Sequence, residues 1–164
     1  MKSPDKFLVG IIIAVVVLLA VVFGVILSRP AVEYQSEDTP AGVTHNYLLA
    51  LQDEDYERAY GYLSPELSGY PESTIQFKRD VDRYSWRFRS SSSVSLSVES
   101  SDFLRDDHAH IDVRETRFYS GDLFSSSQST SNFVIELVLI DNEWKIIDAD
   151  YYFSYCWTYD DGCK

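Results

Sequence analysis

Two histidines and an aspartate alternate along one short stretch of the chain, at His108, His110 and Asp112. In an extended strand, residues two apart share a face and lie about 6–7 Å from each other, and two histidines at that spacing can bind zinc. The residues between and after them are apolar: Ala109, Ile111 and Val113. This alternation favours a plainer interpretation, in which the histidines face solvent from the outer side of a sheet. We therefore predict neither a metal site nor a cofactor.

Two aspartates near the C-terminus could act as general bases. Asp148 and Asp150 share one face of a predicted strand with Trp144 and Ile146, and His45 lies at the start of a predicted helix. An Asp or His that points into a pocket can accept a proton from a substrate. The alternative is that both aspartates lie at the polar end of the strand and are satisfied by hydrogen bonds. The sequence contains neither a Gly-x-Ser-x-Gly nucleophile motif nor a glycine-rich phosphate loop, and we assign no catalytic residue.

A run of alternating aromatic residues lies close to the C-terminus, and its members are Tyr151, Phe153, Tyr155, Trp157 and Tyr159. On an extended strand all five would share one face. One interpretation is that the first two pack in the core and the others cap it. The other is an exposed platform for a sugar, peptide or protein partner. These five residues are our candidate ligand- or partner-binding site.

Length and charge restrict the kinds of protein this can be. The chain has 164 residues, which suggests one domain, and 45% of them are apolar, which excludes a disordered tail. Acidic residues outnumber basic ones 26 to 14, and the formal net charge is -12. Because binding to phosphates needs positive charge, we predict no nucleic-acid partner.

An uninterrupted stretch without charged residues occupies positions 7–27. As a helix it would rise about 31 Å, enough to cross the roughly 30 Å hydrocarbon core of a bilayer. A cleaved signal peptide is the alternative, but its apolar part usually has about 7–15 residues and ends at small residues. The sequence Ser28-Arg29-Pro30 is a poor cleavage site. We therefore predict a single-pass transmembrane helix that attaches the protein to the cell membrane.

The charges around this stretch predict its orientation. Lys2 and Lys6 precede it, and acidic residues dominate after it, so residues 1–6 should be cytoplasmic. Residues 28–39 then form a tether, and residues 40–164 form an extracytoplasmic domain. In that location we expect Cys156 and Cys163 to be joined by a disulfide that closes a C-terminal loop. Free thiols would be expected if the orientation were reversed.

Hydrophobic periodicity predicts the elements of the outer domain. Apolar residues recur at helical spacing in three segments, at about 40–52, 53–63 and 71–88, and they alternate at strand spacing at 94–98, 109–113, 133–140 and 144–152. Asp141-Asn142 is typical of a two-residue hairpin turn. The serine-rich stretches 90–93 and 125–131 are predicted loops. The order of elements predicts an α+β domain, with three helices packed on a curved antiparallel sheet of about four strands.

Two parts of the sequence carry a resemblance to a known family. Residues 47–60, YLLALQDEDYERAY, are followed by LSPEL at 63–67, and NEWKI occupies positions 142–146. In this order they resemble the first helices and the last hairpin of nuclear transport factor two-like domains. The resemblance covers about residues 40–153 and implies a cone-shaped fold with a pocket between sheet and helices. Its members include isomerases, dehydratases, polyketide cyclases and non-catalytic proteins, and bacterial members tethered by one helix are similar in layout.

The predicted membrane anchor, the absence of a matched catalytic set and the aromatic C-terminal strand with its disulfide favour a non-enzymatic function. We expect a single-pass membrane protein whose extracytoplasmic domain binds or supports a partner or small ligand at the cell surface. The partner could be a protein, a glycan or a small hydrophobic ligand, and family members suggest a homodimer through the sheet. The alternative is an isomerase-, dehydratase- or cyclase-like enzyme that acts on a small hydrophobic substrate in the cone.

Overall fold

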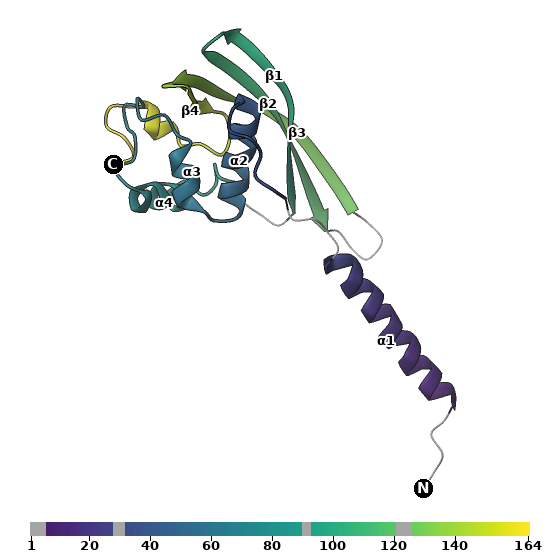
Figure 1. Ribbon diagram of the computed structural model, residues 1–164. Coiled ribbons are helices and arrows are strands. Elements are labelled where there is room, and N and C mark those ends of the chain that lie inside the picture. The colour runs from purple at the N-terminus through teal and green to yellow at the C-terminus, as the bar shows by residue number, and fades with distance from the viewer. Residues whose placement is uncertain (1–5, 28–31, 90–92, 121–125) are drawn as a thin grey trace. The chain divides into compact units, whose positions relative to one another are not determined.

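The computed structural model describes residues 6–27, 32–89, 93–120 and 126–164 (Figure 1). The chain divides into two compact units, residues 1–33 and residues 34–164. The first unit contains one helix, α1, at Lys6–Leu27. The second contains the remaining elements and is the unit that carries every candidate site.

The apolar helix of the first unit requires a correction. Among the residues that the structure describes, no helix is both long enough and apolar enough to cross a membrane. This finding contradicts the predicted transmembrane helix at 7–27. It equally contradicts the single-pass architecture, the contact with the membrane and the assignment to the cell membrane.

Three helices of the second unit begin where short polar side chains can cap them. They are α2 at Pro40–Gln52, α3 at Tyr56–Gly61 and α4 at Thr74–Arg83. The caps are Thr39, Asp55 and Ser73, whose side-chain oxygens accept hydrogen bonds from backbone amides in the first turn, at 3.1, 3.2 and 3.3 Å. Such caps satisfy amides that have no partner inside the helix. The helices agree with the sequence prediction, although α3 and α4 are shorter than the predicted segments.

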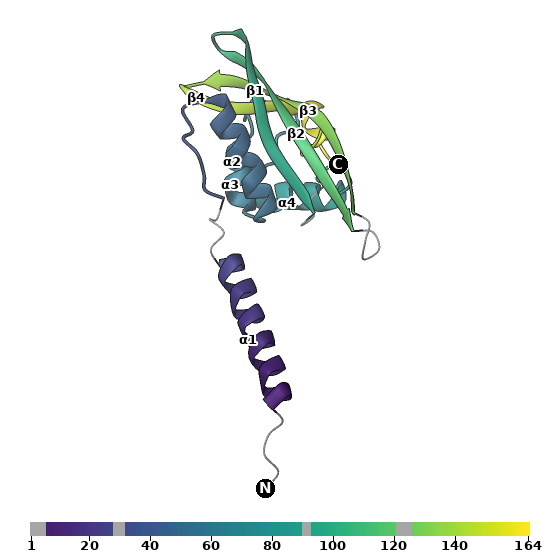
Figure 2. The same cartoon turned by 90° about the vertical axis from the view of Figure 1, so that its right-hand side faces the viewer.

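Four antiparallel strands form one sheet in the order β1-β2-β3-β4. Their bounds are Val94–Arg105, His108–Ser120, Ser126–Ile140 and Glu143–Ala149. Asp141 and Asn142 both adopt positive φ, 50° and 68°, as the predicted two-residue turn between β3 and β4 requires. The three helices α2, α3 and α4 lie on one side of this sheet (Figures 1 and 2). The predicted α+β architecture is therefore confirmed for the second unit.

Two local predictions about strands were wrong. Residues 126–131, predicted as a loop, belong to β3 and pair with residues 115–120 of β2. The exposed polar side chains of residues 127–131 do not prevent this, because a strand is held by backbone hydrogen bonds to its neighbour as well as by burial. The last strand ends at Ala149 instead of Tyr152. Tyr152 has φ of 62°, a conformation that interrupts a strand and turns the chain toward the helices.

The space between sheet and helices is filled mainly by aromatic and aliphatic side chains. Trp157, near the C-terminus, is fully buried. Its ring stacks on Phe77 of α4 with 5.3 Å between centroids, and it contacts Phe153 and Phe88 edge-on. Fully buried rings bring much apolar area into the core, so these contacts stabilise the C-terminal segment against α4.

Candidate functional site

The five alternating aromatic residues do not share one face. Phe153 and Trp157 are buried, and Tyr151 is half-buried. Tyr155 and Tyr159 are 41% and 59% exposed. The reason is that the chain has left the sheet before this run, and Tyr155–Thr158 form a 3-10 helix, η1. Only Tyr155 and Tyr159 therefore present substantial aromatic surface to solvent.

These two tyrosines join three residues that follow α4. The resulting group, which we call the aromatic–arginine cluster, contains Tyr84, Trp86, Arg87, Tyr155 and Tyr159. The ring of Tyr155 contacts Tyr84 at 5.8 Å and Tyr159 at 6.0 Å, both edge-on. The guanidinium carbon of Arg87 lies 4.4 Å from the ring centre of Trp86 and 4.5 Å from that of Tyr155. Trp86 is 65% exposed. The cluster is thus a partly exposed aromatic surface around one cation.

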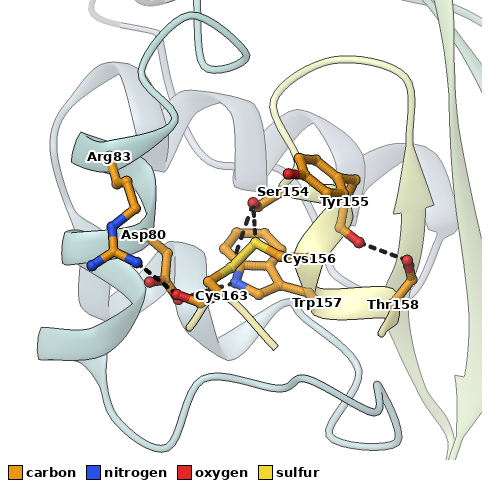
Figure 3. Close-up of a disulfide and its surroundings, with 8 residues drawn as sticks. All are labelled: Asp80, Arg83, Ser154, Tyr155, Cys156, Trp157, Thr158 and Cys163. Carbon is orange, nitrogen blue, oxygen red and sulfur yellow. Dashed lines mark hydrogen bonds between the residues drawn. A yellow bond between two sulfur atoms is a disulfide. The ribbon is translucent and has the colours of Figure 1, made fainter. Parts of the chain in front are cut away.

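A network of contacts holds the C-terminal half of the cluster in place (Figure 3). A disulfide joins Cys156 and Cys163, whose Cα atoms are 4.9 Å apart. The hydroxyl of Ser154 donates to the sulfur of Cys156 at 2.7 Å, and Arg83 of α4 donates to the carbonyl of Cys163, also at 2.7 Å. The amide of Gly69 donates to the carbonyl of Trp157 at 2.9 Å. Tyr155 and Tyr159 are therefore displayed on an anchored loop.

Gly69 lies so close to this loop that a larger residue would not fit. A Cβ at Gly69 would lie 2.6 Å from the carbonyl oxygen of Cys156 and 2.7 Å from that of Tyr159. Both are backbone atoms, which cannot move aside as a flexible side chain would. The identity of residue 69 thus sets how the C-terminal loop packs.

A buried carboxylate lies on the inner side of the sheet. Glu115 of β2 is completely buried and accepts hydrogen bonds from Arg117 at 2.6 Å and from the Tyr152 hydroxyl at 2.8 Å. Arg89 lies 3.5 Å away. Burial alone would raise the pKa of Glu115, but the hydrogen bonds and the two guanidinium charges outweigh it and lower the pKa. Glu115 is therefore held in its charged form and is poorly suited to accept a proton near neutral pH.

The pKa of a second buried carboxylate is shifted in the opposite direction. Asp80 of α4 is fully buried, and one of its oxygens accepts a hydrogen bond from the indole nitrogen of Trp157 at 3.4 Å. Burial raises the pKa of Asp80. Its other oxygen has no partner among the described residues.

An open cleft of about 540 Å³ lies beside α3 and the β3–β4 hairpin. On its wall, Glu37 accepts hydrogen bonds from the Tyr62 hydroxyl at 2.6 Å and from Arg58 at 3.1 Å. The bond from Tyr62, followed by that from Arg58, lowers the pKa of Glu37. Arg58 also stacks on the ring of Tyr34, 3.5 Å from its centre. These contacts attach residues 34–37 to α3, and they pair Glu37 with Arg58 on the wall of the cleft.

The histidines and aspartates considered for chemistry have separate partners. His108 contacts Asp107 at 2.8 Å, His110 contacts Glu136 at 3.2 Å, and Asp112 accepts from Ser100 at 2.6 Å. In the part of the chain that the structure describes, no three such side chains are placed to hold a metal ion. The side chains of Asp148 and Asp150 are exposed and accept backbone amides, from Ala149 and Val134 respectively. His45 is half-buried in α2.

Sequence analysis did not identify Trp86, Arg87, Glu115 or Glu37 as site residues. An exposed Trp beside an Arg is a weak signal for a surface site, and it was present at positions 86 and 87. No comparable signal marks Glu115, because its partners come from β2, from the α4–β1 connection and from the C-terminal segment.

The similarity of this chain to known proteins is a similarity of fold alone. No protein-family model matches the chain, and no curated protein matches it either. A SEC-C motif containing protein from Rhodopseudomonas palustris, RPA3114, superposes with a TM-score of 0.50 at 14% identity, over 73% of this chain and 83% of that one.

Two further solved structures have lower TM-scores. An NTF-2-like protein of unknown function from Shewanella oneidensis MR-1 has a TM-score of 0.43 at 11% identity, over 65% of this chain and 90% of that one. A ketosteroid isomerase-like protein from Erwinia carotovora atroseptica SCRI1043 has a TM-score of 0.43 at 9% identity, over 65% and 87%. The structural neighbours thus include NTF-2-like and isomerase-like proteins, and the membrane-anchored layout expected from the family resemblance is not supported.

Proposed function

We propose that residues 34–164 form a non-enzymatic binding domain whose aromatic–arginine cluster contacts a partner protein. The observation that carries this proposal is the exposure of Trp86 and Tyr159, 65% and 59%, around a half-buried arginine. Trp, Tyr and Arg are the residues that contribute most energy at protein interfaces. The anchored loop reduces the ordering cost of binding, because Tyr155 and Tyr159 are already held in place.

The interior of the domain supports binding over catalysis. Its described part is filled by the protein's own side chains, among them Trp157, Tyr47, Tyr152, Phe77 and Phe153. A general base works best with a pKa near the working pH, yet the pKa of the carboxylate that faces the sheet interior, Glu115, is lowered. The alternative enzyme would need a hollow cone with a proton-accepting group, and these features favour the binding domain instead.

Photo-cross-linking tests the proposal. We would replace Tyr159 with p-benzoylphenylalanine in the full chain, in cells that make the protein, and irradiate them. A matched control carries the same probe at Ile75, which is 83% exposed on α4 outside the cluster. We expect a discrete adduct from position 159 that is absent from position 75 and is lost when Trp86→Ala is added. Adducts of equal yield at both positions, or an adduct that Trp86→Ala leaves unchanged, would refute the proposal.

The homodimer predicted from the family resemblance is a separate proposal. The outer face of the sheet carries half-buried Val134 and Val138 beside the His110–Glu136 pair, a mixed surface of the kind found at protein interfaces. Sedimentation equilibrium of the wild type and of Val138→Lys measures the oligomeric state of each protein. A wild-type dimer that the substitution dissociates would support it, and a monomeric wild type at 100 μM would exclude it.

A further inference from the structure

Three arginines of the second unit stack on aromatic rings. Arg58 lies 3.5 Å from the ring centre of Tyr34, and Arg89 lies 3.7 Å from that of Tyr151. Arg87 lies at 4.4 and 4.5 Å from the rings of Trp86 and Tyr155. A guanidinium above an aromatic ring is attracted electrostatically to the negative face of the ring. The ring does not, however, provide hydrogen-bond acceptors along the directions of the five N–H donors.

Two of the three arginines also have a carboxylate partner. Arg58 pairs with Glu37 at 3.1 Å, and Arg89 pairs with Glu115 at 3.5 Å. Arg87 has no ion pair with any described residue. Its Nε atom is buried and lacks a hydrogen-bond partner within the described ranges. Buried donors are nearly always satisfied in native proteins, so this exception requires an explanation.

A shortage of acidic residues does not explain it. The chain has 26 acidic and 14 basic residues, and the other two stacked arginines each have a nearby carboxylate. The guanidinium of Arg87 is instead oriented by two rings and has no carboxylate partner among the described residues. Because the Nε atom is buried, a carboxylate from another molecule would bind Arg87 at its two terminal Nη atoms, with which it can form two parallel charge-assisted hydrogen bonds.

We propose that the partner of the aromatic–arginine cluster is a peptide segment in which one Asp or Glu carboxylate binds Arg87. An aromatic or aliphatic side chain next to that carboxylate would pack on Trp86 and Tyr159. This inference rests on the proposed function and specifies its partner. One carboxylate is specified instead of an acidic run, because the net charge of -12 repels a polyanion.

Two blocked dipeptides test the inference, acetyl-Phe-Glu-amide and its neutral counterpart acetyl-Phe-Gln-amide. The full chain is titrated with each while the arginine Nε–H and tryptophan indole N–H signals are followed by NMR. We expect the Glu peptide to shift the signals of Arg87 and Trp86 and to bind about tenfold more tightly than the Gln peptide. The preference should weaken as salt is added, because the cluster is partly exposed.

Two variants assign the preference to one arginine. Arg87→Gln should abolish the preference for the Glu peptide, and Arg87→Lys, which keeps the charge but loses the planar pair of donors, should retain part of it. Arg58→Gln is the matched control, since Arg58 is also stacked but already paired with Glu37, and it should leave the preference unchanged. Equal binding of the two peptides, no binding of either, or a preference that survives Arg87→Gln would overturn the inference.

The failure of this inference can be told apart from failure of the proposed function. If the photo-adduct at position 159 still forms in Arg87→Gln at wild-type yield, the cluster binds a partner without using the arginine. The binding domain then stands and the carboxylate proposal falls. If no cluster-dependent adduct forms in any variant, the proposed function fails first.

Discussion

The cleft beside α3 and the aromatic–arginine cluster each contain an arginine stacked on an aromatic ring, but the two arginines differ in whether they also have a carboxylate partner. In the cleft, Arg58 stacks on Tyr34 and pairs with Glu37, which also accepts a hydrogen bond from Tyr62. In the cluster, Arg87 stacks on two rings and has no carboxylate partner among the described residues. The first arrangement is complete and attaches one chain segment to another. The second is incomplete within the described chain, which is why we place the binding function there.

The neighbouring contacts agree with this difference. Residues 34–38 are held on α2 as well, since Gln35 and Asn46 exchange two hydrogen bonds at 2.7 and 2.9 Å. Arg58 and Glu37 thus belong to a structural clamp. The contacts around Arg87 fix its backbone instead. The Arg87 carbonyl accepts a hydrogen bond from the amide of Tyr152 at 3.1 Å, and its guanidinium has no carboxylate partner in the described parts of the chain.

The largest effect on stability is expected where a stacked arginine has a buried partner. Glu115→Gln should lower the free energy of unfolding at pH 7 by about 3 kcal/mol, because it leaves the guanidinium groups of Arg89 and Arg117 without their counter-charge. Urea denaturation followed by circular dichroism measures this. The control Glu143→Gln removes an exposed partner of Lys145 and should cost less than about 0.5 kcal/mol. A similar loss in both variants would mean that the buried pairing contributes nothing special.

An intermediate effect is expected where the cluster depends on its anchored loop. Gly69→Ala should lower the free energy of unfolding by about 2 kcal/mol, because the added Cβ meets backbone atoms of the C-terminal loop. It should also reduce the photo-adduct at position 159. Gly61→Ala is the matched control, since a Cβ there meets nothing within 4 Å, and it should leave both quantities nearly unchanged. Wild-type stability of Gly69→Ala would show that the loop can shift without cost.

The smallest effect is expected in the clamp. Glu37→Gln should lower the free energy of unfolding at pH 7 by about 0.5 kcal/mol, since Glu37 and Arg58 are both partly exposed. The pKa of Glu37 is lowered in the folded state, so the wild type binds fewer protons there than when unfolded. Its extra stability is present above the ordinary pKa of 4.5 and is lost as the pH falls through the lowered value. Urea denaturation from pH 3 to 7 should therefore show the two proteins converging in acid; a constant difference would contradict the assignment.

Local signals were sufficient for much of the second unit. Thr39-Pro40 predicted the start of a helix, and Asp141-Asn142 predicted a two-residue turn, because caps and turns depend on residues that are neighbours in sequence. The strand at 126–131 escaped prediction since it is held by pairing with β2 and not by its own side chains. The aromatic residues at 151–159 would share one face only on an extended strand, and the positive φ of Tyr152, which no local pattern predicted, interrupts that conformation.

The sequence by itself determined the capped helices, the alternating strands and the acidic character of the chain, since each follows from residue types and spacing along the polymer. Only the tertiary structure decided which arginines have partners. Arg87 contacts Tyr155, which lies far along the chain. Two contacts bring the C-terminal segment against the end of α4: the amide of Tyr152 donates a hydrogen bond to the carbonyl of Arg87, and Trp157 packs on Phe77. Contacts between such distant segments depend on how the whole core packs, and no local pattern encodes them.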